Sequence, residues 1–275
     1  MIQIKSRDEI ALMRQAGIVV GNTLATLRDS VKPGISTADL DEIARDCLAK
    51  AGATSNFLGY HGFPATVCTS VNEQIVHGIP SKKAVLADGD IVSIDFGAII
   101  EGYHGDAAIT VPVGEVTHAE LELLRVTEES LWHGMAAGLL GGRLIDVSRA
   151  IESYIRSQPH PTGGSWGIVE EYVGHGIGTE MHQDPQVHNF VGPRMGKGPE
   201  LVEGLALAVE PMVNLGSRMT KMLDDGWTVV TADGSRSAHF EHSFTMTEEG
   251  PWVLTALDGG RDRIAALSSA VATPA

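Results

Sequence analysis

The 275-residue sequence is poor in cysteine, in aromatic residues and in basic residues. Its two cysteines, Cys47 and Cys68, lie far apart and lack the close spacing of a zinc ribbon or a redox motif. This scarcity argues against a disulfide framework and favours a reducing compartment. The 20 basic residues are outnumbered by 35 acidic ones, and the formal charge of −15 argues against binding to DNA or RNA, whose phosphates would repel it.

Long hydrophobic runs are also lacking. The first residues do not form the uninterrupted apolar stretch of a signal peptide, and no run of about 18 apolar residues follows. We therefore expect a cytoplasmic protein that does not enter a membrane. Because 43% of its residues are hydrophobic, the chain can bury a large core, and its length favours a single domain. We expect this domain to span residues 1–265, followed by a small, polar and disordered tail at residues 266–275.

The hydrophobic pattern changes between helical and extended spacing along the chain. Apolar residues at three- and four-residue steps predict helices over residues 6–28, 37–52, 118–137 and 144–157. Segments rich in β-branched residues and bounded by turn residues predict strands over residues 65–79, 90–113, 167–173, 206–215, 228–231 and 239–247. Two rounds of helices followed by strands indicate an α+β protein with internal pseudo-symmetry.

Two acidic residues interrupt the predicted hairpin over residues 90–113. If Glu101 and Gly102 form its turn, Gly97 faces Asp106, and Asp95 lies diagonal to Asp106 on the same face. Two carboxylates at that range would be driven to protonate unless a cation lay between them. A lone aspartate is more often an ordinary turn or strand-end residue, but the pairing favours a divalent metal.

Three further residues could bind such a metal. His175 lies between glycines, Glu210 ends an apolar strand, and Glu241 lies in a strand-like segment, where an unpaired buried carboxylate would be costly. A lone histidine is more often a satisfied core or surface residue than a ligand. Together with the two aspartates these residues offer enough donors for two divalent ions about 3.5–4 Å apart. Spacing alone does not link positions so distant in sequence.

Several segments, in this order, resemble the type I methionine aminopeptidases of peptidase family M24. They are IKSRDEIALMRQAG, residues 60–64, CTSVNEQIVHGIP, DIVSIDFGAIIEGYHGD, GHGIGTEMHQDPQV, residues 210–212 and FEHSFTMT. The joint match is specific and covers about residues 3–257, whereas one segment such as GHGIG would be weak. The resemblance implies a pita-bread fold, which is an α+β, pseudo-two-fold symmetric antiparallel sheet flanked by helices, with a central dimetal site.

The resemblance also implies an activity, the removal of the initiator methionine from nascent proteins with a preference for small second residues. It implies two divalent ions (cobalt, manganese, iron or zinc) held by Asp95, Asp106, His175, Glu210 and Glu241. Asp106 and Glu241 would bridge the ions, and Glu210 would be the general base for attack by water. His77 and His182 would bind the substrate and stabilise the oxyanion. A monovalent ion, sodium or potassium, would bind backbone near Asn72, Gln74 and Ser237.

The positions that match the methionine pocket of the family carry aromatic or sulphur side chains, with one imidazole among them. They are Phe57, Tyr60, His61, Phe63, Cys68, Met181 and Trp227. Such groups suit a thioether, although each could equally be plain core packing. Phe57 replaces a cysteine and Met181 a phenylalanine of many bacterial members, which puts the width of the pocket in question. The family also implies a monomer with transient ribosome contact.

Six other histidines have no partner set that the sequence reveals, and we expect surface or supporting roles for them: His118, His133, His160, His188, His239 and His242.

Two other functions keep parts of this pattern. A hydrolase of Xaa-Pro bonds would retain all five metal ligands, but such relatives usually carry a large N-terminal domain, whereas the first helix here begins near residue 6. Type II enzymes carry an insertion before the last ligand, and the 30-residue gap between Glu210 and Glu241 argues against it. A metal-free binding protein of this fold would have replaced ligands, and all five are present.

Overall fold

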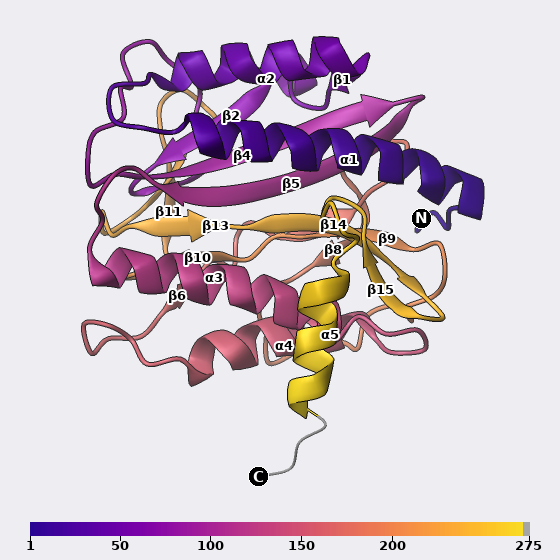
Figure 1. The fold of residues 1–275 in the computed structure, drawn as a ribbon. Helices are drawn as coiled ribbons and strands as arrows, with labels where there is room; N and C mark the ends of the chain where they lie inside the picture. Colours follow the sequence, from indigo (N-terminus) through magenta and orange to yellow (C-terminus); the bar gives the residue numbers. More distant parts are fainter. Residues whose placement is uncertain (272–275) are drawn as a thin grey trace.

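A computed structural model describes residues 1–271 of the chain. Its nine-stranded sheet is antiparallel in every pair (Figure 1). The strand order is β1 (Thr54–Ser55), β4 (Ile91–Ile100), β5 (Tyr103–Pro112), β14 (Glu241–Thr247), β9 (Ala206–Val209), β7 (Gly174–Gly176) and β8 (Gln183–Val187). Off this path, the remaining two strands are β2 (Val67–Val71) on β4 and β15 (Gly250–Val253) on β14.

Two three-stranded sheets complete the β structure of the described residues. One has the order β13 (Ser237–His239), β10 (Met212–Asn214) and β6 (Gly167–Ile168). The other has the order β11 (Thr220–Met222), β12 (Val229–Thr231) and β3 (Gln74–Val76). A short 3₁₀ helix, η1, covers Tyr60–Gly62. Most predicted strands are confirmed, but the one expected over residues 167–173 ends at Ile168.

The four predicted helices are confirmed within two residues at each end. They are α1 (Arg7–Ser30), α2 (Thr37–Ala51), α3 (His118–Ala136) and α4 (Leu144–Ser157). Ser6, Ser36 and Thr117 begin the first three with capping boxes, in which the cap side chain and an acidic side chain three residues later satisfy free backbone N–H groups. Figure 1 shows α1 along β4 and β5, whereas α3 lies against β10 and β13 in the other half.

The first helix is long and apolar enough, by length and hydropathy alone, to cross a membrane. Polar residues interrupt its apolar positions, so the segment contains no long uninterrupted apolar run. Its buried face carries Val20, Leu24 and Leu27, which pack in one hydrophobic cluster with β4 and β5. Packing on the sheet therefore accounts for this apolar face.

A fifth helix, α5 (Arg261–Val271), covers the first part of the segment for which a disordered tail was predicted. Ile264 and Leu267 are partly buried against the second hydrophobic cluster, which gives this segment a reason to be helical. The rest of the predicted tail lies outside the described residues.

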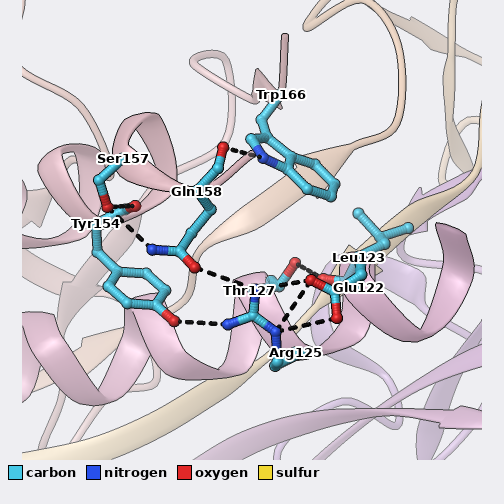
Figure 2. Close-up of polar contacts among 8 residues, drawn as sticks. All are labelled: Glu122, Leu123, Arg125, Thr127, Tyr154, Ser157, Gln158 and Trp166. Carbon is cyan, nitrogen blue, oxygen red and sulfur yellow. Dashed lines mark hydrogen bonds and ion pairs between the residues drawn. The ribbon is translucent and has the colours of Figure 1, made fainter. Parts of the chain in front are cut away.

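A polar network ties α3 to α4 (Figure 2). The Arg125 guanidinium donates to Tyr154 Oη (2.9 Å), to Gln158 Oε1 (3.1 Å) and to the Glu122 carboxylate. Trp166 Nε1 in turn donates to the carbonyl oxygen of Gln158 (3.2 Å). The network thus links the two helices to each other and to Trp166, just before β6.

The predicted hairpin register is confirmed, and it determines which side chains face the site. Gly97 pairs with Asp106 and Ile100 with Tyr103 across β4 and β5. Alternate side chains of β4, among them Ile94 and Phe96, pack under α1 and α2. The side chain of Asp95 therefore points to the opposite face of the sheet, away from these helices.

Candidate metal centre

One row of paired residues crosses three neighbouring strands and carries two of the predicted ligands. Asp95 on β4 pairs with Ala108 on β5, and Ala108 pairs with Glu241 on β14. Directly opposed residues share a face of an antiparallel sheet, so the two carboxylates flank the small side chain of Ala108. The alanine leaves open the space between them.

A second row, two residues further along, carries two more of the predicted ligands. Asp106 on β5 lies beside Ser243 on β14, whose Oγ donates to the Asp106 carbonyl oxygen (2.7 Å) and accepts from its N–H (3.1 Å). Ser243 pairs with Ala208 on β9, and Ala208 pairs with His175 on β7. Small residues therefore separate the ligand positions in this row too. Glu210 follows directly after β9.

The structure brings all five predicted ligands to one cavity of about 260 Å³. Donor atoms of Asp106, His175 and Glu241 lie within 4.8 Å of one another. Glu210, Glu241 and His239 form a second such group, so Glu241 belongs to both. Asp95 is in neither group within the described part of the chain, but it lines the same cavity.

The acidic side chains of this cavity are poorly solvated and repel one another. Burial, together with the charges of Asp106 and Glu210, raises the pKa of Asp95 well above its usual value. Burial and neighbouring carboxylates likewise raise the pKa values of Asp106 and Glu241, and burial raises the pKa of Glu210 to about 8. A cation among these groups would relieve the repulsion that opposes their ionisation.

The donor set fits divalent ions. Asp95 Oδ1, Asp106 Oδ1 and Glu241 Oε1 are buried, and none has a hydrogen-bond partner among residues 1–271. His175 Nδ1 lies 3.0 Å from the Gly176 carbonyl oxygen, which can only accept, so Nδ1 carries the hydrogen and Nε2 keeps its lone pair. Burial lowers the pKa of His175 to about 3, so the imidazole is neutral, as a metal ligand must be.

The two histidines expected to contact substrate lie at the same cavity. His77 and His182 both line it, and the ring of His182 lies 4.4 Å from that of His175. Burial lowers the pKa values of both, that of His77 to about 4. Tyr60 Oη lies 2.7 Å from His182 Nδ1, so a hydrogen donated by the phenol would leave Nε2–H free to donate elsewhere.

The predicted pocket residues form a wall of the cavity, with one exception. Cys68 pairs with Asp95 across β2 and β4, which places the pocket directly beside the acidic floor. His61 is exposed and, as far as residues 1–271 show, contacts Tyr60 without lining the cavity. The residues that line it are Phe57, Tyr60, Phe63, Cys68, Met181 and Trp227.

Sequence reasoning missed four residues near the site. Val76, Tyr172 and Val173 also line the cavity, and the ring of Tyr172 lies 5.8 Å from that of His77. His239 lies beside Glu210 and Glu241, where no partner set was expected. Its place two residues before Glu241 was a weak signal, because alternate residues of an extended segment share a face.

Comparisons with known proteins agree with this geometry. The family model of Metallopeptidase family M24 matches residues 11–248. The chain is 49% identical over 255 residues to the methionine aminopeptidase of Clostridium acetobutylicum, covering 93% of this chain and 99% of that protein. It is 51% identical over 251 residues to methionine aminopeptidase 1 of Mycobacterium tuberculosis, covering 91% and 94%.

A solved structure extends the likeness to three dimensions. The methionine aminopeptidase of Thermotoga maritima matches with a TM-score of 0.88 and 41% identity, and the match covers 93% of this chain and all of that one (100%). The predicted pita-bread fold class is confirmed, and neither an Xaa-Pro hydrolase nor a metal-free binding protein is favoured. The chain belongs to metallopeptidase family M24 and, within that family, to the methionine aminopeptidases.

Proposed function

We propose that this protein removes the N-terminal methionine of polypeptide chains by metal-dependent hydrolysis of the first peptide bond. One observation carries the proposal. A single cavity holds a floor of carboxylates and imidazoles beside a wall of aromatic and sulphur side chains. An unbranched thioether fits such a wall, because sulphur makes favourable contacts with aromatic rings. Relatives about half identical to this chain are named methionine aminopeptidases.

The residues that would hold two divalent ions are the five ligands that line the cavity. Glu241 belongs to both donor groups, which supports a bridging role, and Asp106 is proposed as the second bridge. Such ions supply Lewis acidity, which polarises a carbonyl group and acidifies water. A donor set rich in carboxylates with an imidazole suits manganese, iron, cobalt or zinc. The proposed ligands are Asp95, Asp106, His175, Glu210 and Glu241.

Two of the proposed ligands and two histidines of the cavity are also proposed to bind the substrate and move its protons. Glu210 is proposed as the general base, because its side chain keeps 14% exposure and can reach water, whereas Glu241 keeps 3%. The carboxylate of Asp95 would attract the free α-amino group, which limits cleavage to the first residue. Burial lowers the pKa values of His77 and His182, which favours the neutral imidazole, and each can donate a hydrogen to the carbonyl oxygen as charge develops on it.

Nascent chains in the cytoplasm are the proposed substrates, with transient contact to the ribosome, and the proposed state is a monomer. A sodium or potassium ion is proposed at the backbone of Asn72, Gln74 and Ser237. The Ser237 N–H donates to the Asn72 carbonyl oxygen (3.0 Å), which brings two of these backbone segments together.

Hydrolysis of three peptides by the chelated protein, with manganese or cobalt restored, tests the proposal. We expect metal-dependent release of methionine from Met-Gly-Met-Met and little release of alanine from Ala-Gly-Met-Met. The Glu241→Gln variant should cleave Met-Gly-Met-Met slowly. The matched control is Glu101→Gln, which changes an exposed glutamate in the turn of the β4–β5 hairpin and should leave the rate unchanged. Equal release of both first residues, or cleavage confined to a peptide that begins Met-Pro, would overturn the proposal.

A further inference from the structure

His239, the last residue of β13, is a buried imidazole whose ring makes no hydrogen bond within the described residues. Its side chain is 1% exposed, and both ring nitrogens lack a hydrogen-bond partner within the described residues. Unpaired polar atoms in a protein interior are destabilising, so such a side chain needs an explanation. Within residues 1–271, the ion-pair contacts of this ring are with two proposed metal ligands, Glu210 and Glu241.

The backbone of His239 is fixed against the strands that carry the ligands. Its N–H donates to Thr110 Oγ1 (2.9 Å), and the same hydroxyl donates to its carbonyl oxygen (2.8 Å). Thr110 Oγ1 also lies 2.9 Å from Ser93 Oγ on β4. These hydrogen bonds hold the backbone of His239 in place relative to β4 and β5, the strands that carry Asp95 and Asp106.

The ring faces one oxygen of Glu210, and a different histidine faces the other. His239 Nε2 lies 3.4 Å from Glu210 Oε2, whereas His175 Nε2 lies 3.7 Å from Glu210 Oε1. Glu210 and His175 line the cavity, but His239 is not among the lining residues described. The carboxylate thus lies between an imidazole in the cavity and an imidazole behind it, so direct metal ligation by His239 is disfavoured.

We propose that His239 is a positioning residue that acts through Glu210. Its Nε2–H donates to Glu210 Oε2 and leaves Oε1 on the side of His175, where the two residues would hold an ion. A shift of about 0.4 Å would bring the two atoms within normal N–H···O length. The inference rests on the proposed function, because it takes Glu210 as a metal ligand. Hydrogen-bond partners behind a ligand typically change metal affinity or activity about 10–100-fold when they are lost.

Three substitutions separate the role of Nε2 from that of the ring. His239→Gln places an amide nitrogen near the position of Nε2, His239→Asn places one near Nδ1, and His239→Leu removes both. Calorimetric titration with manganese, after a chelator has stripped the proteins of metal and been removed, measures the affinity for manganese without any turnover. We expect the parent and His239→Gln to agree within about threefold, and His239→Asn and His239→Leu to bind one ion about 10–100-fold more weakly. If His239 served only to fill space, glutamine would not restore the manganese affinity that asparagine and leucine lose.

The controls separate failure of this inference from failure of the proposed function. His133→Gln, which changes a histidine stacked on Tyr154 in the α3–α4 layer, should bind manganese like the parent. Equal affinities in all three His239 variants and the parent would overturn the positioning role alone. If His239→Gln lost as much manganese affinity as His239→Leu, and the visible spectrum of its cobalt form were altered, direct metal ligation by His239 would replace the positioning role. A parent protein that binds no divalent ion would overturn the proposed function as well.

Discussion

At the scale of single residues, the cavity floor combines groups that destabilise one another without a cation. Asp106 shows how the fold holds such a group, because its backbone is clamped by Ser243 on the neighbouring strand. Its carboxylate can therefore be removed without breaking the pairing of β5 with β14. The residues proposed to bind metal and those proposed to bind substrate can then be distinguished by mutation.

Asp106→Ala is expected to lose metal binding and activity together, because Asp106 supplies a donor to the group with His175 and Glu241. His182→Ala is expected to keep metal binding and to lower kcat about 10²–10³-fold, the loss typical of one oxyanion donor. Metal analysis and steady-state kinetics on peptides measure the two effects. Retained activity in Asp106→Ala would contradict its assignment as a ligand, and His188→Ala, at a partly exposed histidine, is the control.

The pocket wall gives a second residue-scale prediction. The Trp227 ring packs at 5.1 Å on that of Phe63 and lines the cavity, so Trp227→Ala should widen the pocket. We expect the preference for methionine over a smaller first residue to fall about 10-fold or more, as loss of pocket contacts commonly gives. The ratio of kcat/KM values for two peptides measures it. Trp252→Ala, on β15 outside this cavity, should leave that ratio unchanged.

At the scale of elements, α1 approaches the sheet through glycines. A Cβ at Gly105 on β5 would lie 2.8 Å from the Gly17 backbone nitrogen, and a Cβ at Gly17 would collide with the Leu254 carbonyl oxygen. The absence of side chains at both positions lets the helix lie directly on β5 and the segment after β15. This close approach fixes the distance between the helix layer and the strands that carry Asp95 and Asp106.

Gly17→Ala should therefore destabilise the protein although alanine favours helices. The collision involves backbone, which cannot move away cheaply, and overpacking of this kind costs about 1–3 kcal/mol. Chemical denaturation measures the loss. Gly196→Ala, where a Cβ would meet nothing within 4 Å, is the control and should change the free energy of unfolding by less than about 0.5 kcal/mol. A Gly17→Ala protein as stable as the parent would refute the close contact.

Elements also differ in how well the sequence predicts them. The long helices were predictable because apolar spacing and capping residues lie within each segment. Five strands lie outside the predicted segments: β1 (Thr54–Ser55), β7 (Gly174–Gly176), β8 (Gln183–Val187), β11 (Thr220–Met222) and β15 (Gly250–Val253). They are short, and β8 alternates half-buried and exposed residues over most of its length, so their local pattern is weak and their partners decide their structure.

At the scale of the whole molecule, the site is built on strands from both halves, and each half has its own hydrophobic cluster. One cluster packs α1 and α2 on β4 and β5, and the other packs α3 and α4 on the strands of the second half. The pairing of β5 with β14 joins them and places Asp106 near Glu241. The packing of both halves thus fixes the positions of the proposed ligands.

The buried carboxylates predict a pH dependence of stability in the chelated protein. Burial raises the pKa of Glu210 to about 8, so near neutral pH the folded state keeps a proton that the unfolded chain has lost. The free energy of unfolding should therefore fall as pH rises from 7.0 to about 8.5, a range above the usual pKa of histidine. Thermal unfolding midpoints measure the fall, and about 2–4 °C corresponds to roughly 1 kcal/mol in chains near this size.

Two comparisons isolate the cause of that fall. Glu210→Gln removes the titrating group but keeps contributions shared with the parent, such as that of Lys5, whose pKa burial lowers to about 8. The variant should lose less stability between the two pH values than the parent. Saturation with manganese should also reduce the fall, because a bound cation favours the ionised carboxylates. A parent that is as stable at pH 8.5 as at pH 7.0 in chelator would contradict the prediction.

By itself the sequence determined what lies within one segment. Turn residues and strand alternation fix the β4–β5 register, and with it the shared face of Asp95 and Asp106. Only the tertiary structure decided that Glu241 and His175 join them, that His61 stays outside the cavity, and that His239 lies behind Glu210. The physical reason is that local pattern acts through neighbouring residues, whereas pairing between β5, β14, β9 and β7 depends on the packing of segments far apart in the chain.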